Sequence, residues 1–81
     1  MWMREHTLTV LGQVVRHWRS ESRLSQEALA DRCGFHRTYV GQLERGERNP
    51  SLISLLTLCR GLDVTLPDFF TRYADSLGTP L

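Results

Sequence analysis

The sequence predicts an all-α domain, and three observations support this fold class. Apolar residues recur at helical spacing along several segments, capping residues and glycines separate those segments, and no segment alternates apolar and polar residues long enough for a strand. The chain has 81 residues, which suits one hydrophobic core. We therefore expect a single compact five-helix bundle over residues 1–81, with its core between about 8 and 77.

The first helix is expected from Leu8 to about Glu21. It is indicated by an apolar stripe with the spacing i, i+3, i+4 and i+7, formed by Leu11, Val14, Val15 and Trp18. Residues 1–7 have no clear periodicity, so we expect a frayed tail or a lead-in to this helix. Trp2 receives no role.

A second helix is expected after Ser25, whose side chain suits the N-cap position. Glu27 falls in the first turn, where a negative charge is favourable beside the helix dipole. The helix should end at Gly34, because glycine tolerates the positive φ of a helix C-cap. Ala28 and Leu29 are expected to face the core.

A third helix is expected from about His36 to Arg45, with Gly46 ending it. Helical periodicity places Val40 and Leu43 on one side of this segment. The opposite side, which we expect to face outward, carries Arg37, Thr38, Gly41, Gln42 and Arg45. A glycine in mid-helix costs about 1 kcal/mol relative to alanine, so Gly41 indicates a close approach, either to a ligand or to the second helix.

Two further helices complete the fold. The sequence Asn49-Pro50-Ser51 is a helix start signal, with either Asn49 or Ser51 as the N-cap. The fourth helix should end at Gly61 and turn four side chains inward: Leu52, Leu55, Leu56 and Cys59. Thr65 to Asp68 matches another start pattern, and the fifth helix carries an apolar cluster of Phe69, Phe70, Tyr73 and Leu77.

Composition describes an ordinary soluble globular chain. It is 41% hydrophobic and 23% charged, with a net charge of +1. No stretch approaches the roughly 20 apolar residues of a membrane span, and the N-terminus lacks the apolar core of a signal peptide, so we expect a cytoplasmic protein. Residues 1–50 hold eight arginines against six acids, whereas residues 51–81 hold two against three. The basic excess therefore lies with the second and third helices.

Residues that often carry catalytic or metal chemistry are scattered. Cys33 and Cys59 lie far apart, and we expect both to be small, buried, reduced thiols. His6, His17 and His36 do not stand at ligand spacing from a cysteine or carboxylate. No nucleophile elbow or glycine-rich phosphate loop is present. We expect no metal, no cofactor and no enzymatic activity.

The outward side of the third helix suits the reading of DNA bases. Arginine pairs with guanine, glutamine pairs with adenine, and threonine offers a hydroxyl and a methyl group. These residue types are also common on any solvated helix. The preceding helix, the turn at Gly34 and the basic loop that follows favour the DNA-binding interpretation, a helix-turn-helix within Leu24 to Leu52.

Phosphate contacts are expected on either side of this helix. Gln26 falls at the N-terminal end of the second helix, where free backbone N–H groups attract an anion. Arg48 and Asn49 follow the third helix and could reach the DNA backbone, although Arg48 also suits a solvated loop. Arg45 could equally satisfy the C-terminal helix dipole. The full set expected at phosphate is Ser25, Gln26, Tyr39, Arg45, Arg48 and Asn49.

The C-terminal third of the chain is more apolar than a short helix needs for its own packing. We expect part of this apolar surface to form a homodimer interface, and an aggregation-prone patch is the alternative. The residues assigned to the interface are Leu62, Val64, Leu66, Phe69, Phe70 and Tyr73.

The segment LSQEALADRCGF followed by HRTYVGQLERGERNPSL resembles the Cro/Xre-type phage-repressor family of helix-turn-helix proteins. The resemblance implies a lambda-repressor-like five-helix domain that binds a palindromic operator in double-stranded DNA as a homodimer. It places Gln26 on phosphate and four residues at the major groove: His36, Arg37, Thr38 and Gln42. It also implies a structural ion pair between Arg19 and Glu44.

Within that family, the third helix and the loop after it are similar to the controller proteins of restriction-modification systems. Those controllers often carry an acidic residue at the position of His36. A prophage or stand-alone regulator is an alternative, and so is an antitoxin whose DNA binding is autoregulatory. RNA polymerase is a candidate partner, and a membrane is not. Activation or repression of transcription is left open.

Overall fold

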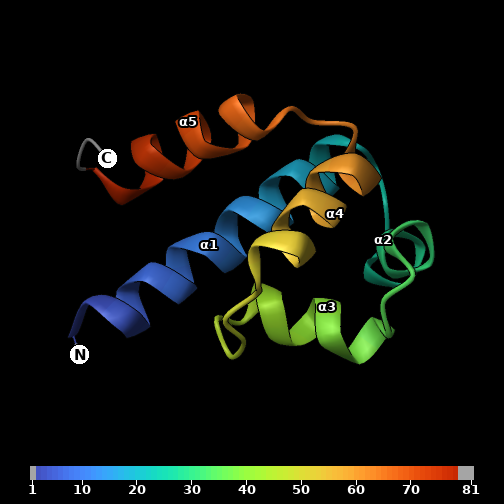
Figure 1. Ribbon diagram of the computed structural model, residues 1–81, viewed down its shortest axis with the longest axis horizontal. Helices are drawn as coiled ribbons and strands as arrows, with labels where there is room; N and C mark the ends of the chain where they lie inside the picture. The colour runs from blue at the N-terminus through green and yellow to red at the C-terminus, as the bar shows by residue number, and fades with distance from the viewer. Residues whose placement is uncertain (1, 79–81) are drawn as a thin grey trace.

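The computed structural model describes residues 2–78, and five helices form an all-α fold, as predicted. The helices are α1 (Trp2–Glu21), α2 (Gln26–Cys33), α3 (Arg37–Glu44), α4 (Leu52–Leu62) and α5 (Leu66–Leu77). Figure 1 shows α1 as the long central helix, with α5 along one side of it and α3 across the other. No helix within residues 2–78 is long and apolar enough to cross a membrane.

Every helix contributes a side chain to one core. The most completely buried large side chains share relative exposures below 2%: Val14, Val15, Leu29, Val40, Leu43, Leu58, Leu62 and Phe69. Burying one side chain of this size contributes about 1.5–3 kcal/mol. The core therefore fixes α2 and α3 against α1 and α4, and this packing holds the turn between α2 and α3 in place.

Local capping explains most of the helix boundaries. The Ser25 hydroxyl accepts the backbone N–H of Ala28 at 3.0 Å, and Gly34 ends α2 with φ of 71°. Ser51, rather than Asn49, caps α4. These caps satisfy backbone groups that have no partner inside a helix.

The first helix begins earlier than predicted. It starts at Trp2 rather than Leu8, and residues 3–7 are all exposed. Their turns continue the backbone hydrogen bonds of the helix without burying an apolar stripe, which is why the periodicity of the sequence starts only at Leu8. In α2 the buried pair is Leu29 and Ala30, and Ala28 is only half-buried.

The predicted inward face of α4 is partly wrong. Leu52 is 65% exposed and Leu56 is 43% exposed, whereas Leu58 and Leu62 are buried. The reason is that the apolar residues of α4 span more than half of its circumference, so its sequence does not specify which part of that surface packs.

Gly61 does not end α4, which continues to Leu62 and is capped by Asp63 at φ of 57°. Glycine is needed inside the helix because a Cβ at Gly61 would lie 2.5 Å from the Cys33 sulfur. Cys33 is half-buried and Cys59 is buried, and both are free thiols. Burial raises the pKa of both thiols, so neither is an activated nucleophile.

Candidate nucleic-acid interface

A short turn joins α2 to α3 and sets the geometry of the site. The N–H of Phe35 donates to the Ala30 carbonyl at 2.9 Å, and Phe35 packs edge-to-face on Tyr39 with ring centroids 5.0 Å apart. The first turns of α2 and α3 border an open hollow of about 580 Å³. It is lined by Arg19, Ser25, Gln26, Glu27, Arg37, Thr38, Gly41 and Arg45.

The outward side of α3 is largely as predicted. Arg37 has a side chain that is 70% exposed, Thr38 is exposed, and Gln42 is half-buried. Gly41 is buried rather than outward, because Gln26 and Arg45 cover it. A Cβ at this position would lie 3.4 Å from the Gln26 Oε1 atom and 3.2 Å from Arg45 Nη1. A side chain at this position would need only a small shift of the flexible Arg45 guanidinium, and its contact with Gln26 would be an ordinary one.

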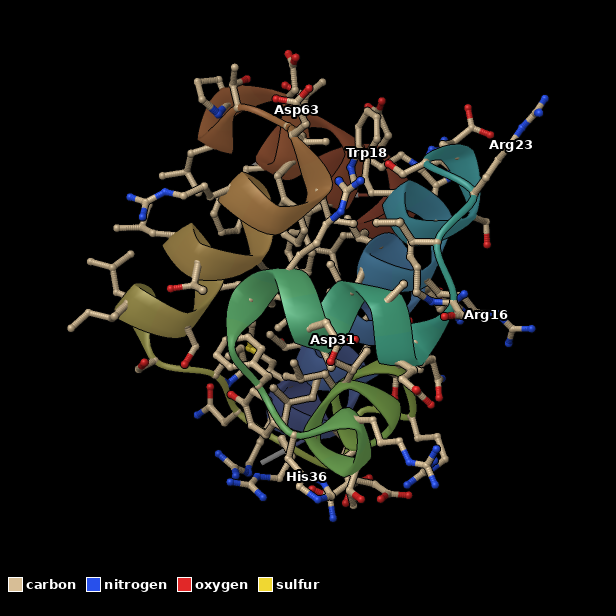
Figure 2. All side chains as sticks on the ribbon, turned by 90° about the vertical axis from the view of Figure 1, so that its right-hand side faces the viewer. Arg16, Trp18, Arg23, Asp31, His36 and Asp63 are labelled. Atoms are coloured by element: carbon tan, nitrogen blue, oxygen red, sulfur yellow. The ribbon has the colours of Figure 1, made fainter. Side chains whose placement is uncertain are left out.

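His36 caps α3 instead of opening it. Its Nδ1 atom accepts the backbone N–H of Thr38 at 3.1 Å, and the helix begins at Arg37. Figure 2 shows His36 at the end of the molecule remote from Asp63 and Trp18. An aspartate at this position could accept the same hydrogen bond, so the imidazole replaces an acidic cap without changing the start of the helix.

Three arginines near α3 have side-chain partners that the sequence did not reveal. Arg37 Nη1 lies 2.9 Å from the Glu27 carboxylate, and Arg45 Nε lies 2.9 Å from Glu47. Arg48 donates to the Gln42 side chain at 3.1 Å, and its guanidinium lies 5.0 Å from the centroid of the Tyr39 ring. The hydrogen bond from Arg45 also lowers the pKa of Glu47. These contacts orient all three guanidinium groups.

The predicted pair of Arg19 and Glu44 is present, and it belongs to a larger network. The Glu44 side chain is only 4% exposed, and Arg19 binds it through two nitrogens. Gln26 donates its amide N–H to the same carboxylate at 3.0 Å, while Arg19 also donates to the Leu24 carbonyl at 2.8 Å. The hydrogen bond with Glu44 raises the pKa of Arg19. The network ties α1, the start of α2 and the end of α3 together.

The remaining residues assigned to phosphate lie around the hollow or on the loop after α3. Ser25 is exposed and its hydroxyl caps α2, while Tyr39 is half-buried beneath Arg48. Asn49 is exposed on the loop that Gly46 begins with φ of 76°. That glycine packs on the backbone of Thr9 in α1, so α1 supports the loop.

The predicted dimer interface requires a correction. Leu62, Phe69 and Tyr73 are 2%, 0% and 6% exposed, so they belong to the core of the protomer. The reason is that α5 packs along α1 and turns these side chains inward (Figure 1). The other three assigned residues, Val64, Leu66 and Phe70, are half-buried. The strongly exposed large apolar side chains lie elsewhere: Met3 on α1, and Leu52, Ile53 and Leu56 on α4.

Within residues 2–78, no group of three or more histidine, cysteine, aspartate or glutamate side chains is placed to hold an ion.

This arrangement of two short helices, a glycine turn and a polar second helix is that of a helix-turn-helix protein. Residues 10–79 match the model of the helix-turn-helix domain family, and the chain belongs to that family. Among curated relatives, it is 44% identical to the control protein C.SmaI of Serratia marcescens over 63 residues, covering 78% of this chain and 75% of that protein.

Solved structures of restriction-modification controller proteins are also similar to this chain. The restriction-modification controller protein C.AhdI of Aeromonas hydrophila is 44% identical, with a TM-score of 0.75 over 78% of this chain and 96% of its own. The controller protein C.Esp1396I, solved as a tetramer in complex with its natural 35 base-pair operator, is 30% identical. Its TM-score is 0.85 over 90% of this chain and 96% of its own.

Proposed function

We propose that this protein is a sequence-specific, double-stranded-DNA-binding transcriptional regulator of the restriction-modification controller type. The observation that carries the proposal is the exposed pair of Arg37 and Thr38 beside the N-terminal end of α2, on a helix held rigidly by the core. Major-groove readers need such a helix with polar groups at its N-terminal half. Three-quarters of a control-protein relative aligns with this chain at 44% identity, which supports the same role.

The residues around the hollow divide into two roles. Arg37, Thr38 and Gln42 are assigned to base edges, together with the exposed ring of His36. Backbone N–H groups at the start of α2, with Ser25 and Gln26, are assigned to a phosphate on one side of the groove. Arg45, which lines the same hollow, is also assigned to phosphate, and on the other side of the groove the phosphate contacts are assigned to Tyr39, Arg48 and Asn49. Phosphate contacts set the register, and base contacts set the sequence preference.

We assign the homodimer interface to α4. Leu52, Ile53 and Leu56 are 65%, 76% and 43% exposed. They lie on one side of α4, because Leu56 follows Leu52 by four residues and Ile53 by three. A two-fold axis through this patch would bury it against itself, which is the usual way in which a homodimer covers an apolar surface. The two copies of α3 would then meet half-sites about one helical turn, roughly 34 Å, apart on a palindromic operator.

A regulator of the restriction-modification controller type would act in the cytoplasm by occupying its operator. There it would block or recruit RNA polymerase, and it would have no catalytic step. No ligand domain lies within residues 2–78, so protein concentration acting through dimerisation is the expected signal.

Selection of bound duplexes from a random-sequence pool tests the proposal. The purified protein should enrich one symmetric consensus at two salt concentrations, while affinity falls steeply as salt rises because phosphate contacts release counterions. Enrichment of no consensus at either salt concentration would contradict sequence-specific binding.

Arg37 and Arg48 should differ in what they contribute. Arg37→Ala is expected to cost about 1–3 kcal/mol on the selected duplex and to relax the preference at one base pair in each half-site. Arg48→Ala should weaken binding to all duplexes alike, because a phosphate contact carries no sequence information. Fluorescence anisotropy with a set of single-base-pair variants measures both effects. A uniform loss for both variants would show that the role of Arg37 is wrongly assigned.

Ile53→Asp should separate dimerisation from folding. A carboxylate in the centre of the apolar α4 patch is expected to weaken the dimer by about 2 kcal/mol, roughly 30-fold, while the protomer stays folded. Sedimentation equilibrium measures the monomer–dimer constant, and circular dichroism reports the helices. Thr71→Asp, at an exposed position of α5, is the control. An unchanged constant for Ile53→Asp would place the interface elsewhere.

A further inference from the structure

The ion pair between Glu27 and Arg37 lies within the surface assigned to DNA. Both side chains are exposed, at 63% and 70%, and a distance of 2.9 Å joins Glu27 Oε2 to Arg37 Nη1. Glu27 belongs to the first turn of α2, next to the residues assigned to phosphate, and Arg37 is the first residue of α3. An acidic side chain therefore lies on a surface that is proposed to bind DNA, which is a polyanion.

Two other carboxylates lie next to arginines that line this hollow, and both are paired: Glu44 with Arg19, and Glu47 with Arg45. Glu44 is 4% exposed and holds Arg19 and Gln26, so it presents little negative charge to a ligand. Glu27 is the acidic residue that lines the hollow with an exposed carboxylate. A phosphate that approaches Gln26 therefore meets both the favourable N-terminal end of α2 and a nearby negative charge.

The geometry of the pair leaves much of Arg37 free. Glu27 takes one N–H of Nη1, and a guanidinium has five N–H donors. The edge formed by Nε and Nη2 can still donate two hydrogen bonds to a guanine. Contact with a phosphate, in contrast, would compete directly with the Glu27 carboxylate for the same positive charge.

From this geometry we infer that Glu27 is a specificity-determining residue, which positions Arg37 for a base edge and opposes its use as a general phosphate contact. The inference rests on the proposed function and concerns the same site. On cognate DNA the pair is kept, and Arg37 reads guanine with its free edge. On other DNA the carboxylate repels the backbone and holds Arg37 away from phosphate, so the ratio of specific to non-specific affinity rises.

Glu27→Gln tests this role, with Asp31→Asn as the matched control. Asp31 lies one turn further along α2 (Figure 2). None of the ion pairs within residues 2–78 includes it. Both substitutions remove one negative charge from the same helix. Each variant is measured by fluorescence anisotropy on two labelled duplexes, the consensus selected by the wild-type protein and a scrambled sequence of equal composition, across a series of salt concentrations.

We expect the Glu27→Gln variant to bind the scrambled duplex about 5–10-fold more tightly and the consensus at most about 2-fold more tightly, so that the specificity ratio falls. The slope of log K against log salt on the scrambled duplex should steepen by about 0.9, the value for one added phosphate contact. In an Arg37→Ala background, Glu27→Gln should leave the base preference unchanged.

An unchanged or higher specificity ratio for Glu27→Gln would overturn the inference. An equal fall of the specificity ratio for Asp31→Asn would also overturn it, because the effect would then come only from the change in net charge. Failure of the wild-type protein to select any consensus is a different result. It would contradict the proposed function itself, before Glu27 is considered.

Discussion

Replacement of Glu44 by alanine is expected to destabilise the protein by about 3 kcal/mol, because it removes one partner of a largely buried ion pair. The Glu44 carboxylate accepts hydrogen bonds from Arg19 and Gln26, and those donors would be left inside the junction of three helices. The Arg19 side chain is only 15% exposed, so little water can replace the carboxylate. The expected loss lies at the lower end for buried ion pairs, because some solvent still reaches Arg19.

Urea unfolding followed by circular dichroism measures this loss. Glu47→Ala is the control, because Glu47 also pairs with an arginine but its side chain is 51% exposed. The midpoint should fall strongly for Glu44→Ala and barely move for Glu47→Ala, since exposed pairs contribute little to stability. Equal shifts for the two variants would mean that the network at Glu44 is not structurally important.

Gly12→Ala is the second substitution with a large expected effect. A Cβ at Gly12 would lie 2.5 Å from the backbone oxygens of Leu43 and Glu44, and backbone atoms cannot rotate away as a flexible side chain can. The end of α3 would have to shift from α1, at a cost of about 3 kcal/mol.

In thermal unfolding, a loss of this size lowers the Tm of so small a domain by about 15 °C. Gln13→Ala, at the exposed neighbouring position of the same helix, should change the Tm by only a few degrees. A Tm for Gly12→Ala that matches the wild-type value would contradict the close contact between α1 and α3.

Helix positions could be predicted from the sequence because local chemistry determines them. Ser25, Gly34 and Thr65 act as caps through hydrogen bonds within a few residues, and those positions follow from residue type alone. The inward side of α1 also follows from periodicity, since its polar and apolar residues are segregated.

The packing of α4 and α5 could not be predicted in the same way. Apolar side chains span more than half of the circumference of α4, so the choice between Leu52 and Leu58 as core residues depends on where α2 and α5 lie. Length and composition alone assign the excess of apolar residues in the C-terminal cluster to a dimer interface. Packing of α5 along α1 accounts for Phe69 and Tyr73 within one protomer.

The candidate site was predictable in residue type but not in its pairing. Exposure of Arg37 and Thr38 follows from the third-helix periodicity, and burial of Gly41 follows only once Gln26 is placed over it. Glu27 and Arg37 are ten residues apart on different helices, so no sequence spacing signals their contact. Such pairs depend on the angle between α2 and α3, which the core sets.

The central claim is that the polar side of α3 enters a groove of DNA. Amide chemical-shift mapping of the ¹⁵N-labelled protein on addition of a selected duplex tests it most directly. We predict the largest shifts at residues 25–27, 36–42 and 48–49, with smaller changes across α5. Large shifts concentrated on α5, with the amides of α3 unmoved at saturation, would contradict it.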